Sequence, residues 1–195
     1  MLAFSRLTSI LFFLLSLSFL TCALPTSPAG QTNALAARGT GAELLNICAN
    51  LEADVQVEID AIAKVDIKVL ADVQAHVGVI VDKINVAAKA IVALGAKIDI
   101  EAEVKAQIAI HIAAVIKLVV NLCITLVAKL GVTVLLALLA KIDVCLQLLL
   151  VNLSIVVEGI IVLVAKLVVD LTVQVFVNLH LTLCLNVLGL VGISL

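Results

Sequence analysis

The sequence predicts an all-α protein: a bundle of about four or five long, very apolar helices that follows a cleaved signal peptide and a disordered leader. Hydrophobic residues make up 64% of the 195 residues and charged residues only 13%. No proline follows Gly41. Single polar residues recur every four positions in the C-terminal half, which is the spacing of neighbours on one helix face. Together these observations favour helices that bury apolar faces.

The first element is an apolar N-terminal segment. Arg6 precedes an apolar run from Leu7 to Leu20, and the small residues Thr21 and Ala23 flank a cleavage point. This order is typical of a secretory signal peptide over residues 1–23, and the run is short for a membrane span. A retained membrane anchor is the alternative.

The second element, residues 24–41, is rich in Pro, Ser, Thr, Gly and Ala, which predicts a flexible leader. Arg38 is a weak candidate for a processing site. A signal peptide, a Pro/Ser/Thr leader and an Ala/Val-rich body form a layout that resembles uncharacterised hydrophobic secreted proteins of filamentous fungi. This resemblance implies secretion and no known activity.

Residues 42–195 are expected to form a single helical domain. Glycines are the only breaks, and no Asn-Gly or Asp-Gly hairpin signal occurs. Helices are therefore predicted at about 43–76, 79–94, 96–130, 132–157 and 160–188.

The stretch 97–112 also permits a strand, because polar and apolar residues alternate there. A sixteen-residue strand is about three times the usual length. At 100° per residue, eight polar residues instead fall within one arc of about 120°. This arc favours one helix with a continuous polar stripe, made of Asp99, Glu103, Gln107, His111, Lys117, Asn121, Thr125 and Lys129.

Charge divides the domain into an acidic amphipathic part, 42–107, and a strongly apolar part, 108–195. The first has eleven acidic residues and six lysines, and the second has three acidic residues and four lysines. Two polar rows cross the apolar part. They are Lys117, Asn121, Thr125, Lys129 and Thr133, and Lys166, Asp170, Gln174, Asn178, Thr182 and Asn186.

Two environments for these rows stay open. A lysine or aspartate at the centre of a membrane span costs at least about 2.5 kcal/mol, so the rows would have to face partner helices or snorkel outward. Otherwise they form the water-facing side of helices in an oily bundle.

Cysteine count and secretion predict two disulfides among Cys48, Cys123, Cys145 and Cys184, with three pairings open. Asn152 begins an Asn-Leu-Ser glycosylation sequon inside an apolar run. His180 and Cys184 have metal-ligand spacing, but no second ligand pair accompanies them. We therefore expect no metal, cofactor or catalytic residue.

These observations predict a secreted, non-enzymatic protein whose apolar body associates with membranes or lipids. The alternatives are a self-assembling protein of the cell surface, as a homo-oligomer, and an integral membrane protein of the secretory pathway. Nucleic-acid binding is not expected, because the net charge is −2 and the chain has no Trp or Tyr.

Overall fold

The computed structural model describes residues 29–171 and 173–190, with the side chains of 29–38 excepted. The predicted signal peptide, 1–23, lies outside the described residues. The chain divides into two compact units, 1–36 and 37–195, and the second carries the core. Every regular element in the described part is a helix, which confirms the all-α class.

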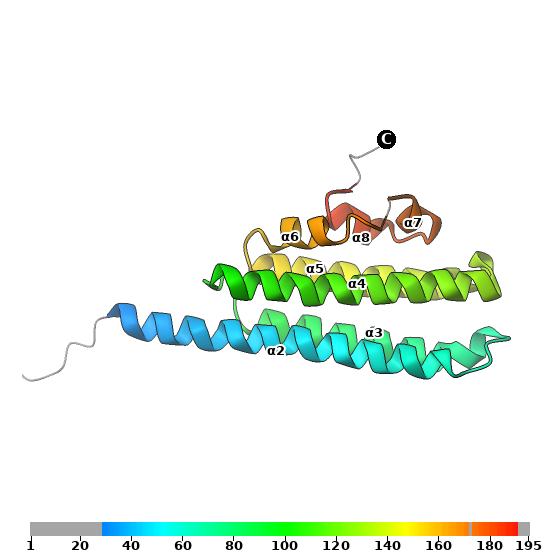
Figure 1. Cartoon of the computed structure of the whole chain (residues 1–195), viewed down its shortest axis with the longest axis horizontal. Coiled ribbons are helices and arrows are strands. Elements are labelled where there is room, and N and C mark those ends of the chain that lie inside the picture. Colours follow the sequence, from blue (N-terminus) through cyan, green and yellow to red (C-terminus); the bar gives the residue numbers. More distant parts are fainter. Residues whose placement is uncertain (1–28, 172, 191–195) are drawn as a thin grey trace, which may run out of the picture. The chain divides into compact units, whose positions relative to one another are not determined.

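Seven helices follow one another along the described chain (Figure 1). They are α2 (Ala29–Ala63), α3 (Leu70–Ala93), α4 (Ala102–Leu130), α5 (Val132–Val156), α6 (Ile160–Leu167), α7 (Val173–Asn178) and α8 (Thr182–Val187).

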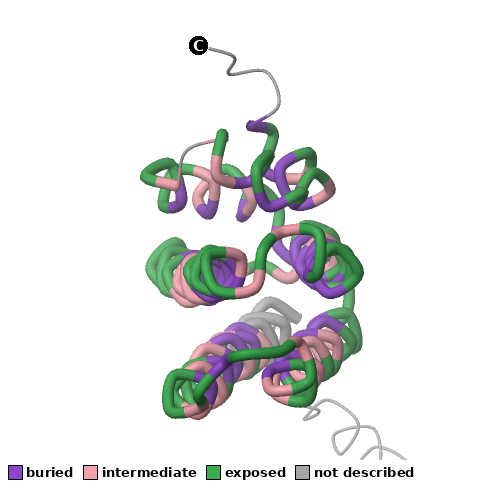
Figure 2. Tube along the Cα trace, turned by 90° about the vertical axis from the view of Figure 1, so that its right-hand side faces the viewer, coloured by how far each residue is buried: buried purple, intermediate pink, exposed green. Residues whose placement is uncertain are grey.

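Within residues 37–190 the helices form three layers, with α2 and α3 in the first, α4 and α5 in the second, and α6 to α8 in the third (Figure 1). Helix α5 packs on both α3 and α8, and α4 packs on α6. In the end-on view of Figure 2, buried positions face the neighbouring helices and exposed positions lie along the outer edges. The middle layer is therefore covered from two sides.

Helix α2 begins at Ala29, so residues 29–41 are helical and the predicted flexible leader is wrong for this stretch. No proline follows Pro28, and Ala34–Ala37 is a run of strong helix formers. Glycine inside a helix costs only about 1 kcal/mol relative to alanine, so Gly39 and Gly41 do not end the helix.

The first predicted break, at Gly78, is also wrong, since Gly78 lies within α3. The chain turns at 64–69 instead. The Asp72 carboxylate accepts the backbone N–H groups of Lys68 and Val69 at 2.9 and 2.8 Å, which satisfies donors at the start of α3. This cap replaces the glycine that was expected to mark the boundary.

Residues 97–101 are not helical, so the predicted helix 96–130 begins later, at Ala102. Lys97 and Ile98 donate backbone hydrogen bonds to the carbonyls of Ile155 and Val156 at 3.1 and 2.8 Å. From Ala102 onward the alternating stretch is helical, which confirms the helix over the strand for 102–112.

The predicted helix 160–188 is three short helices, and His180 explains the break between the last two. His180 has φ of 57°, and its N–H donates to Val177 while that of Leu181 donates to Phe176. These two bonds form a Schellman motif, which usually has glycine at the left-handed position. Leu181 and Phe176 are both fully buried, so packing holds a non-glycine residue in this conformation.

Candidate functional surface

The two edges of the middle layer differ in chemistry. On α4, the predicted polar stripe faces outward, with Glu103, Gln107, Asn121, Thr125 and Lys129 exposed. We call these residues, with the half-buried His111 and Lys117, the α4 polar edge. The second polar row, from Lys166 to Asn186, is exposed at each of its six positions. Both rows therefore lie on the outside of the bundle and not between its helices.

Two residues of the α4 polar edge join the layers. His111 Nδ1 lies 2.6 Å from Glu52 Oε2 on α2, and Lys117 Nζ donates to Asp170 Oδ2 at 2.9 Å beyond α6. The Lys117 ammonium lowers the pKa of the exposed Asp170 carboxyl through this hydrogen bond. The edge thus has a structural role in addition to its contact with solvent.

The exposed side of α5 is apolar. Val134, Val144, Leu148, Val151 and Ile155 are between 36% and 54% exposed. With the exposed Ala137 and Lys141 they form a row at alternating intervals of three and four residues. We call these seven residues the α5 stripe. Lys141 is its one polar member, so α5 presents an apolar surface about 32 Å long, at 1.5 Å per residue, with a single charge within it.

A groove lies between α2 and α3, with a volume of about 390 Å³. Its apolar lining residues are Ile47, Leu51, Val79, Val86, Ala87 and Ala90, and its polar ones are Asn50, Asp54, Asp82 and Lys83. We call it the α2–α3 groove. Lys83 Nζ lies 3.3 Å from Asp54 Oδ1 and 3.7 Å from Glu58 Oε1, so this lysine is turned toward carboxylates of α2.

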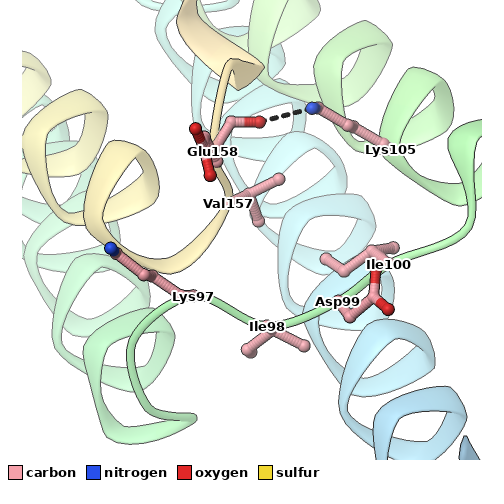
Figure 3. A pocket seen from close by; sticks show the side chains of 7 residues that line it. All are labelled: Lys97, Ile98, Asp99, Ile100, Lys105, Val157 and Glu158. Atoms are coloured by element: carbon pink, nitrogen blue, oxygen red, sulfur yellow. Dashed lines mark hydrogen bonds between the residues drawn. The ribbon is translucent and has the colours of Figure 1, made fainter.

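A second cavity, of about 260 Å³, lies beside the non-helical segment 97–100 (Figure 3). Lys105 Nζ donates to the carbonyl oxygen of Glu158 across it. The side chains of Lys97 and Asp99 point to different sides of the segment (Figure 3).

The buried Asp143 is a polar residue that the sequence does not single out. It is only 3% exposed, and its carboxylate accepts the backbone N–H groups of Leu183 and Cys184 at 2.9 and 2.8 Å. These bonds satisfy donors in the first turn of α8, which makes Asp143 a structural cap. Only its surroundings in three dimensions identify this role.

All four candidate disulfide cysteines are free thiols and buried, so the structure does not contain the two predicted disulfides. Burial raises the pKa of Cys48, Cys123, Cys145 and Cys184 to about 12. The disulfide prediction rests on an even cysteine count and on expected secretion, which are arguments about compartment and carry no geometry. These positions instead serve as small apolar core residues.

The remaining candidate residues are the sequon asparagine, Asn152, and the pair His180 and Cys184. Asn152 is half-buried, and its Nδ2 donates to the Ala88 carbonyl at 3.0 Å. His180 is exposed in the turn before α8, whereas Cys184 is buried within that helix. No group of three metal-binding side chains occurs among residues whose positions are described.

Two helices, α4 and α5, are long and apolar enough to cross a membrane by length and composition, and half of the most apolar window of each is buried inside the protein. Comparison with protein-family models and with curated proteins finds no match.

Proposed function

We propose that this protein is a secreted, non-enzymatic protein that associates with lipid surfaces through the α5 stripe. The supporting observation is the contrast between the two edges of the middle layer, since six of seven positions are apolar on α5 whereas the α4 edge is polar. Each Å² of apolar surface that is removed from water contributes about 25 cal/mol of favourable free energy. Lipid contact at this one edge needs no unfolding.

Association from one side is better supported than a span. Lys141 lies near the middle of α5, and Lys117, Asn121 and Thr125 lie along the middle of α4. In a spanning hairpin these side chains would face hydrocarbon, at a cost of at least about 2.5 kcal/mol for each lysine. On a membrane surface, the lysine stem lies along the apolar face and its ammonium reaches the headgroups.

Flotation of the purified protein with phosphatidylcholine vesicles tests this proposal. The double variant Val144→Gln/Leu148→Gln removes two apolar contacts from the centre of the stripe, and we expect vesicle affinity to fall about tenfold or more. Ile110→Gln/Ile124→Gln is the matched control. These isoleucines are 54% and 42% exposed and lie on α4, outside the α5 stripe, so affinity should stay within about twofold.

Equal binding by both double variants would place the lipid contact elsewhere on the chain. A wild-type protein that fails to float with vesicles would contradict the proposal as a whole. Far-UV circular dichroism of each variant establishes that the helices are retained.

Self-assembly is the second candidate function, and the spacing of the α5 stripe is consistent with it. Intervals of three and four residues over three heptads are the pattern of a helix that packs along another helix. An apolar helix face that contacts lipid has the same spacing, so the two functions are separated by experiment.

A further inference from the structure

We infer that, in the absence of lipid, the α5 stripe of one copy docks in the α2–α3 groove of a second copy. The inference rests on the proposed function in taking the stripe as the adhesive surface of the protein, and it adds the partner that covers the stripe in water.

The charges of the two surfaces are complementary. The α5 stripe carries one cation, Lys141, and no anion. The α2–α3 groove has two carboxylates at its sides, Asp54 and Asp82, and its lysine already lies beside Asp54 and Glu58. Within residues 39–171 and 173–190, neither Lys141 nor Asp82 forms an ion pair. A helix with one lysine in an apolar row therefore matches an apolar groove with a free carboxylate.

The groove is long enough to cover about half of the stripe. On α3 the groove extends from Val79 to Ala90, which is eleven steps along the helix, or about 16 Å. The central part of the α5 stripe, from Ala137 to Leu148, is also eleven steps long. Val79 and Val86 line the groove and are 39% and 67% exposed, so they are available to Val144 and Leu148 of the second copy.

The stripe and the groove are different surfaces of one chain, so the contact is heterologous. Each copy offers a free stripe and a free groove after it has bound a neighbour, and such contacts produce rings or open chains rather than only pairs. A lipid surface that covers the stripe competes with this contact, because the same side chains cannot face both.

Sedimentation velocity of the purified protein in lipid-free buffer, over a range of concentrations, tests the inference. Wild type should associate. Lys141→Glu and Asp82→Lys should each weaken association about tenfold or more, because each places like charges opposite one another. The double variant Lys141→Glu/Asp82→Lys restores opposite charges and should recover association, as should an equimolar mixture of the two single variants.

Lys166→Glu is the matched control, because Lys166 is exposed on α6, outside both surfaces. It should sediment as wild type. Wild type that stays monomeric would overturn the inference, and so would association that Asp82→Lys leaves unchanged, which would indicate an α5-to-α5 contact instead. Vesicle flotation of the same samples is read separately, so a monomer that binds lipid refutes only this inference, and an assembly that ignores lipid refutes only the proposed function.

Discussion

At the scale of single residues, burial determines the chemistry of this protein more than residue type does. Asp143 is a carboxylate within the core, but two backbone N–H groups occupy it as a cap. The four buried cysteines are thiols whose ionisation is suppressed by desolvation. These groups stabilise the fold and offer no reactive centre.

The cysteines lead to a labelling prediction. With pKa values of about 12, all four thiols should resist iodoacetamide at pH 8 in the folded protein. In denaturant without reductant, Cys48, Cys123, Cys145 and Cys184 should each gain one label by peptide mass spectrometry. Disulfide-linked peptides in that digest would contradict the structure and reinstate the pairing predicted from the sequence.

The same pKa values predict that the stability of the folded protein falls as pH rises. The pKa of each thiol is raised from about 8.5 in the unfolded chain to about 12 in the fold. The stabilising contribution is therefore complete below about pH 8.5 and is lost as pH rises toward 12. The urea midpoint should fall through this window, and less so in Cys145→Ala, which has one ionising thiol fewer.

At the scale of elements, the α4–α5 hairpin depends on one connecting residue. Gly131 alone separates the two helices, with φ of 82° and ψ of 150°. That backbone conformation is essentially restricted to glycine. The hairpin is therefore sensitive to substitution at this position although the surrounding space is open.

Gly131→Ala should destabilise the protein by about 1–3 kcal/mol, because alanine is strained in this conformation. Gly78→Ala is the control, since Gly78 lies within α3 and nothing lies within 4 Å of an added Cβ. It should stabilise by about 0.5–1 kcal/mol. Urea unfolding of both variants checks the prediction, and equal effects of the same sign would contradict it.

Elements could be predicted from the sequence where glycine or apolar periodicity marks them, and could not where another residue takes that role. The α4–α5 boundary at Gly131 and the helical nature of 102–112 follow from local pattern. The breaks at 64–69 and at His180 do not, because a carboxylate cap and buried packing produce them. The α5 stripe was hidden because the direction of each helix face depends on neighbours far away in sequence.

At the scale of the whole molecule, the described core is built around a covered middle layer. Ile108, Ile112 and Ile116 of α4 are fully buried in this layer. The outer layers have at least one free face, and α7 and α8 are only six residues long. Stability should therefore be greatest in the middle layer.

Native-state hydrogen exchange read by mass spectrometry checks this order. Peptides covering 108–120 should exchange most slowly, because they open only with global unfolding. Peptides covering 173–187 should exchange at least about tenfold faster, through local opening. The reverse order would show that the short helices, and not the hairpin, hold the fold together.

The contrast between the two edges of the middle layer also determines how the protein would orient at a boundary between two phases. Under the proposed function, the polar α4 edge and the apolar α5 edge would make the folded body of residues 39–190 surface-active. At an air–water boundary it would adsorb in one orientation, with α4 toward the water, and lower the surface tension while its helices stay intact.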